Sequence, residues 1–302
     1  MALPPTYYQG TDGAWLAANF SLGAVPVDDN HVIAPAAVTA SITGIDQTLI
    51  DLEYLEFARG YRGNIGASGN PLIIDADKLI HRGSGTLWHE STATALGGAD
   101  WIVIDSDNVS SLAANIAGAV THRVSVRKGQ VTLAATLGST TLPNQVDVSY
   151  RNNPSDDATV TINCALLANT GILNMMAGLC TITVGGAAAA AFPIVNITGG
   201  TLTFTNNGGA TDVITTAYIG GTGVLRYNTI NAMVTAYILK GGTLDLLQND
   251  VAKTIGTVHL FPGGRLIYDP DVTTITTLND LGGIIQKVKD AAGGFGGAPQ
   301  SS

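Results

Sequence analysis

Two short acidic pairs are the residues of this sequence best suited, by type and spacing, to do chemistry. They are Asp75 with Asp77, followed closely by His81 and Arg82, and Asp105 with Asp107. Glycoside hydrolysis needs two carboxylates about 5 to 9.5 Å apart, and two acids separated by one residue on a strand can meet that requirement. The same spacing is also typical of turn acids at strand ends. We favour the turn interpretation and expect no catalytic residues.

The histidines and cysteines form no recognisable metal motif. No two of the five histidines have the four-residue spacing of a helical zinc site, and no Cys-x-x-Cys occurs. The glycine pairs are not followed by the Lys-Ser or Lys-Thr of a phosphate-binding loop. We therefore expect neither a metal nor a cofactor. Cys164 and Cys180 could pair across neighbouring turns of a repeat, but we favour two buried, reduced thiols.

Four aromatic residues near the N-terminus are the candidate partner contacts: Tyr7, Tyr8, Trp15 and Phe20. Aromatic side chains dominate the energetics of many protein interfaces. They are equally suited to cap the first strands of a stacked fold, whose open edge must be covered. Both interpretations stay open on the sequence alone.

The composition indicates a β-rich chain with little charge. Of the 302 residues only 12% are charged, about half the usual share. The net charge is −9 and the basic residues are scattered, which argues against direct binding to nucleic acid. Acidic residues are mostly Asp, a turn former, rather than the helix former Glu. The chain contains no 18-residue apolar run and begins without the features of a secretory signal, so we expect no membrane span and no export signal.

A repeat of about 22 residues is the main signal. Each unit has a glycine, then apolar residues at its third and fifth positions, and a short strand-like stretch precedes the glycine. The units begin at Gly178, Gly200, Gly223, Gly242 and Gly264, with looser units at Gly129 and Ala158 and a last one at Gly283. The five main glycines are therefore 22, 23, 19 and 22 residues apart. Alternation over so few residues is typical of strands with one inward face.

This repeat predicts an all-β fold, a right-handed parallel β-helix. One unit cannot bury its inner face alone, whereas units stacked at about 4.8 Å share a continuous core. A β-sandwich does not require the same residues every 22 positions, and a calcium-binding roll needs aspartates that these units lack. The run 49–57 fits a helix or a strand by its apolar spacing, and we favour a strand because Gly60 and Gly63 follow closely.

We divide the chain into four parts. Residues 1–30 form an N-terminal arm, and residues 31–120 form an N-terminal β cap with the first coils. Residues 121–290 form the regular coils, and residues 291–302 form a flexible, glycine-rich tail.

Several segments resemble those of β-helical structural proteins of tailed-phage particles. The opening resemblance runs through Trp15, Asn19-Phe20, Gly23, Val25-Pro26, Asp28 and Val32-Ile33. A second lies in Gly60-Tyr-Arg-Gly-Asn-Ile-Gly66 with the following Pro71-Leu72, and the Gly-x-Leu units add a third. The resemblance implies a virion structural protein of the capsid decoration or cement type, and it carries no catalytic residues.

We therefore expect a non-enzymatic, homotrimeric protein that stabilises a phage particle by binding its major capsid protein or another virion protein. It would be made in the host cytoplasm and reside in the virion, with no contact to nucleic acid or membrane. The alternatives are a carbohydrate-binding or depolymerising β-helix of the tailspike kind, and a surface adhesin. A depolymerase predicts clustered Asp and exposed aromatic residues in a groove.

Overall fold

The computed structural model describes most of the chain. The described residues are 4–10, 19–42, 46–92, 101–115, 123–134, 145–149, 158–164, 171–184, 191–206, 213–228, 232–247 and 252–288. Throughout these residues the regular structure is β, with no α-helix, as the preference for Asp over Glu predicts. The chain divides into two compact units, an N-terminal unit of Met1–Val160 and a C-terminal unit of Thr161–Ser302.

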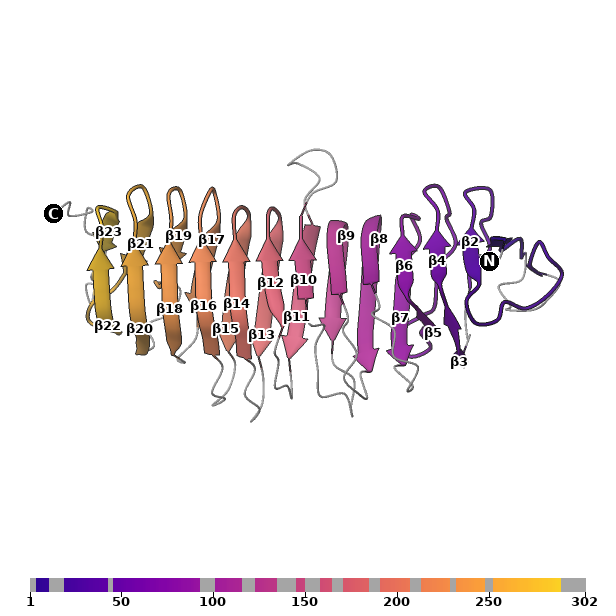
Figure 1. Cartoon of the computed structure of the whole chain (residues 1–302), viewed down its shortest axis with the longest axis horizontal. Coiled ribbons are helices and arrows are strands. Elements are labelled where there is room, and N and C mark those ends of the chain that lie inside the picture. The colour runs from indigo at the N-terminus through magenta and orange to yellow at the C-terminus, as the bar shows by residue number, and fades with distance from the viewer. Residues whose placement is uncertain are drawn as a thin grey trace. The chain divides into compact units, whose positions relative to one another are not determined.

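Parallel strands in two ladders build the N-terminal unit (Figure 1). The first ladder contains β1 (Thr6–Tyr7), β2 (His31–Ala34), β4 (Tyr54–Phe57), β6 (Lys78–His81), the first halves of β8 (Trp101–Asn115) and β9 (Arg123–Ala134), and β10 (Gln145–Val148). The second contains β3 (Asp46–Leu52), β5 (Leu72–Ala76), β7 (Leu87–Thr92) and the later halves of β8 and β9. β11 (Ala158–Cys164) spans the boundary between the units. The run 49–57 is strand, as predicted.

The C-terminal unit repeats the same arrangement with greater regularity (Figure 1). Its first ladder contains β12 (Ile172–Met175), β14 (Ala191–Ile197), β16 (Val213–Ile219), β18 (Met233–Ile238), β20 (Lys253–Leu260) and β22 (Thr273–Asp280). Its second contains β13 (Leu179–Val184), β15 (Thr201–Asn206), β17 (Val224–Asn228), β19 (Thr243–Asp245), β21 (Arg265–Tyr268) and β23 (Ile284–Lys287). Each coil thus contributes one strand to each ladder, which confirms a parallel β-solenoid.

The strand register confirms the repeat predicted from the sequence. Ile172 pairs with Ile194, 22 residues later, and Ile214 pairs with Met233, 19 residues later. The third positions of the repeat stack directly on one another in the second ladder, and all are buried: Cys180, Leu202, Leu225, Leu244 and Leu266. The side chain of Cys164 lies outside the described ones, so the expectation that Cys164 and Cys180 are two reduced thiols rather than a pair is untested.

Glycine is required at the short turns that join the two ladders. Gly241 has a φ of 80°, a left-handed conformation that other residues adopt only with strain. At the next position, a Cβ on Gly242 would overlap the carbonyl oxygen of Ile219 in the preceding coil. Neighbouring coils therefore approach here more closely than any side chain permits, which explains the glycine pairs of the repeat.

The two ends of the strand ladders are finished in different ways. At the N-terminal end β1 pairs with β2, and the adjoining Tyr8 and Phe20 are buried. At the C-terminal end two charged residues take positions that earlier coils fill with buried apolar side chains. Asp280 stands in register with Leu260, and Lys287 with Tyr268. Both side chains are exposed, and Asp280 Oδ1 accepts hydrogen bonds from the Gly282 and Gly283 backbone at 2.9 and 3.1 Å. Charged side chains on a terminal strand discourage its pairing with another chain.

Candidate functional site

The structure describes only part of the first acidic pair and its neighbours. Asp77 lies exposed just before β6, whereas His81 is fully buried in the core of the solenoid. Arg82 binds Glu56, with Nη1 to Oε1 at 2.6 Å. The side chains of Asp75 and Asp107 lie outside the described ones, so their part in the predicted pairs is untested.

Two further acids of this region, Glu56 and Asp105, are held by partner side chains. Glu56 accepts a hydrogen bond from the Tyr54 hydroxyl at 2.8 Å, and burial together with this bond raises the pKa of Tyr54 to about 12. Asp105 is 4% exposed and lies 3.4 Å from the Arg59 guanidinium. The Arg82–Glu56 pair joins neighbouring coils and the Arg59–Asp105 pair joins coils two apart, which is a structural use of charge.

His81 occupies an inward column between Phe57 and Ile104, where the other residues are apolar. Its Nε2 lies 3.1 Å from the Gly85 carbonyl oxygen and donates to it, whereas its Nδ1 has no partner among the described residues. Burial lowers the pKa of His81 to about 4, because a protonated ring would carry an uncompensated charge in the core. His81 is therefore neutral at pH 7 and closed to solvent.

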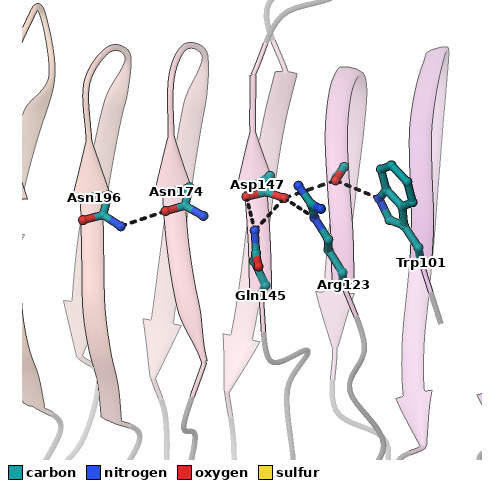
Figure 2. A network of polar contacts seen from close by, with 7 residues as sticks. Trp101, Arg123, Gln145, Asp147, Asn174 and Asn196 are labelled. Atoms are coloured by element: carbon teal, nitrogen blue, oxygen red, sulfur yellow. Dashed lines mark hydrogen bonds and ion pairs between the residues drawn. The ribbon is translucent and has the colours of Figure 1, made fainter. Parts of the chain in front are cut away.

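Asp147 on β10 is the centre of the densest polar network in Figure 2. Its carboxylate accepts hydrogen bonds from Arg123 Nε at 2.7 Å, Ser125 Oγ at 3.3 Å and Gln145 Nε2 at 2.9 Å. Ser125 in turn accepts from the Trp101 indole at 3.0 Å. The carboxylate thus joins donors from β9 and β10, which is a structural use of its charge.

Cations and aromatic rings alternate along the outer side of the first ladder in the N-terminal unit. Lys78 Nζ lies 4.5 Å from the centre of the Trp101 ring, and the Arg123 guanidinium carbon lies 5.0 Å from it. Tyr54 continues the column towards His31, with ring centres 5.7 Å apart. Register neighbours of Trp101 on both sides are thus cations, so this ring is not a free stacking surface for a sugar.

The matching side of the C-terminal unit carries stacked rings. Tyr218 and Tyr237 have centres 4.9 Å apart and planes 9° apart, and Tyr237 and His259 have centres 4.7 Å apart and planes 5° apart. Earlier in the same column Asn196 donates to Asn174 at 2.8 Å (Figure 2). The rings cover one another's faces and present their edges outward, which is not the platform that sugar stacking needs. The sequence analysis did not predict this ring stack, although Thr-Ala-Tyr-Ile is repeated at 216–219 and 235–238.

The four N-terminal aromatic residues have different environments. Tyr8 and Phe20 are 0% and 3% exposed and meet edge to face, with ring centres 5.6 Å apart. Tyr7 is 40% exposed. Trp15 lies outside the described residues. Tyr8 and Phe20 therefore serve the capping role, and Tyr7 is the described member of the set that is available to a partner.

A second apolar group, not singled out from the sequence, lies beside Tyr7 in the arm loop, which we define as residues 21–30. Leu22, Val25 and Val27 are 58%, 37% and 60% exposed. Their spacing follows no strand or helix period, and their exposure could not be inferred from it. Their position between turn-forming residues was the sequence feature that could have indicated an exposed loop.

The arm loop is nevertheless well anchored. Ser21 exchanges two hydrogen bonds with the Tyr7 backbone, and Asn30 Oδ1 accepts from the Val27 backbone at 3.0 Å. Asp28 Oδ1 accepts from the backbone of Asp51 in the next coil, also at 3.0 Å. The loop therefore holds exposed apolar side chains in a defined geometry, as a preformed binding surface does.

Within the described ranges there is no helix long and apolar enough to cross a membrane. The same ranges contain no group of three or more His, Cys, Asp or Glu side chains placed to hold a metal ion. The chain matches no protein-family model, no curated protein and no solved structure.

Proposed function

We propose that this chain is a non-catalytic structural protein of a tailed-phage particle, of the capsid decoration or cement type. It docks on a coat protein through the arm loop and Tyr7. The observation that carries the proposal is the anchored loop with three exposed apolar side chains, Leu22, Val25 and Val27. Exposed apolar side chains that gather on one anchored loop are a candidate partner-binding surface.

The use of polar residues supports a structural role. Asp147, Asp105 and Glu56 bind arginines from other coils, and His81 is sealed in the core. These four titratable side chains therefore stabilise the stack. The covered faces of Trp101 and of the Tyr218–Tyr237–His259 stack weigh against a carbohydrate-binding alternative.

The first strands of the N-terminal unit and the last strands of the C-terminal unit carry features that oppose pairing with another chain. The N-terminal end is capped by Tyr8 and Phe20, and the C-terminal end carries Asp280 and Lys287 at inward register positions. Such ends oppose growth into filaments, so binding is left to the loops and outer sides. In this proposal the chain works as an oligomer on the virion surface and is made in the host cytoplasm.

Binding to capsid shells tests the proposal. Shells assembled from a tailed-phage major coat protein of the same genome as this chain are mixed with the purified full-length protein and sedimented. We expect saturable co-sedimentation that Leu22→Asp and Val27→Asp each weaken about ten- to a hundredfold, because burying such a side chain contributes about 1.5–3 kcal/mol. Leu281→Asp is the matched control, since Leu281 is 53% exposed but belongs to the C-terminal unit.

Two results would overturn the proposal. One is the absence of co-sedimentation at protein concentrations up to about 10 μM, at which a typical specific complex would be formed. The other is shortening of capsular polysaccharides by the purified chain, which would favour the depolymerase alternative. If Leu22→Asp and Leu281→Asp weaken shell binding equally, the chain still binds the particle but the arm loop is not its contact.

A further inference from the structure

One outer side of the C-terminal unit lacks permanent charge. We define the uncharged face as the outward side chains of β16, β18, β20 and β22. They are Thr215, Thr216, Tyr218, Val234, Thr235, Tyr237, Thr254, Thr257, His259, Thr274, Thr277 and Asn279. Neither Lys, Arg, Asp nor Glu is among these described residues, and the charged residues of the four strands stand elsewhere, with Lys253 buried and Asp280 at an inward register position.

The outer side of the second ladder differs in this respect. There Arg226 is in register with Asp245, and Arg265 stands one coil further along. The absence of charge is therefore a property of one face rather than of the whole unit. This contrast is what a binding face produces, because charged residues are depleted from interface cores and tyrosine is enriched there.

The uncharged face is also rigidly ordered. Thr216, Thr235, Thr257 and Thr277 stand in one register column. The stacked rings of Tyr218, Tyr237 and His259 form the neighbouring column, and the Asn279 amide ends it 3.3 Å from His259 Nδ1. Side chains held by their neighbours lose little entropy when a partner covers them.

We infer that this face is where two copies of the chain associate side by side. A symmetric contact brings a patch against the same patch of the second copy, so charged residues close to the two-fold axis would lie against their own copies. Hydroxyl and amide groups avoid that conflict, because each can both donate and accept hydrogen bonds. The chain carries a net charge of −9, so copies approach with least repulsion along a face that bears no charge.

The size of the face sets the expected affinity. Four strands at about 4.8 Å spacing, each with about five residues at about 3.3 Å, cover on the order of 300–400 Å². Two copies then bury less than the 1,200–2,000 Å² of a standard stable interface. We therefore expect association in the micromolar range, which becomes stronger when a particle surface concentrates the copies. A two-fold contact of this kind forms pairs of chains rather than the trimer expected from the sequence. The inference rests on the proposed function only for that biological setting.

Analytical ultracentrifugation of the full-length protein over about 1–200 μM tests this inference. We expect the average mass to rise with concentration above the 30.9 kDa of one chain. Val234→Glu places a charge on the face, at a side chain that is 48% exposed and so tolerant of substitution. It should weaken association about a hundredfold, since it buries an uncompensated charge. Val224→Glu makes the same change on the second ladder and should leave association unchanged.

Salt provides a second readout. Between 0.05 and 1 M NaCl the association should strengthen, because screening reduces the repulsion between like-charged copies and breaks no ion pair in the contact. A mass of one chain at every concentration would overturn the inference, and so would equal effects of Val234→Glu and Val224→Glu or weakening by salt. Coat binding is measured separately through the arm loop, so failure here is distinguishable from failure of the proposed function.

Discussion

Lowering the pH from 7 to 5 should destabilise the N-terminal unit through His81. The ring is fully buried, its Nε2 donates to Gly85, and its Nδ1 has no partner in the described part of the chain. Protonation would place a charge and an unsatisfied N–H in the core. The folded chain resists this, and the pKa falls from the ordinary 6.5 to about 4.

The sign and size follow from proton linkage. Below pH 6.5 the unfolded chain binds a proton at this histidine and the folded chain does not, so stability is lost as the pH falls from about 6.5 and levels off below about 4. A difference of 2.5 pKa units corresponds to about 3 kcal/mol in total, and about 2 kcal/mol of it is lost by pH 5.

Urea unfolding of the wild-type chain and of His81→Gln at pH 7 and pH 5 measures this contribution. Glutamine retains an N–H donor for the Gly85 carbonyl but does not titrate, so it separates the charge from the hydrogen bond. We expect the wild-type chain to lose about 2 kcal/mol more than the variant over this interval. Equal losses in the two proteins would refute the assignment of the acid sensitivity to His81.

Four further perturbations have defined outcomes. Gly242→Ala should lower the free energy of unfolding by about 2–4 kcal/mol, because the added Cβ clashes with the Ile219 carbonyl oxygen. Gly69→Ala should cost only about 1 kcal/mol, because its left-handed φ of 79° is the sole obstacle, and urea unfolding midpoints measure both values. Asp147→Ala should cost about 1–3 kcal/mol in the same assay by removing the acceptor of Arg123 and Gln145, and a neutral result would contradict the network in Figure 2. Phe20→Ala should cost about 3–5 kcal/mol at the N-terminal cap, seen as faster hydrogen exchange in β2 and not in β20. Replacing Asp280 with Leu and Lys287 with Tyr together should produce end-to-end species in light scattering, and an unchanged mass would remove these charges as edge protection.

Much of the fold could be predicted because the repeat records the core directly. Leu202, Leu225 and Leu244 recur at fixed intervals, and in the structure they stack in one buried column. The strand at 54–57 followed from its closeness to Gly60, and the glycine pairs followed from the need for tight turns. Periodicity identifies the inward residues because every coil faces the same apolar interior.

The candidate surfaces could not be predicted in the same way. The inward position of His81 depends on its register with Phe57, which a lone histidine in the sequence does not reveal. The exposure of Leu22 and Val27 depends on how the arm loop is anchored, and no period marks it. The uncharged face emerges only when outward residues from four coils are viewed together, since each strand alone is an ordinary alternating segment.

The most direct test is whether the chain is part of a phage particle and, if so, whether the arm loop is the part that contacts the coat. Particles produced from the genome that encodes the chain are washed and imaged by electron cryomicroscopy, with the protein content confirmed by mass spectrometry. The account predicts solenoid density on the shell with the arm loop, residues 21–30, at the coat contact, and loss of that density with Leu22→Asp combined with Val27→Asp. Washed particles that contain no trace of the chain would contradict it.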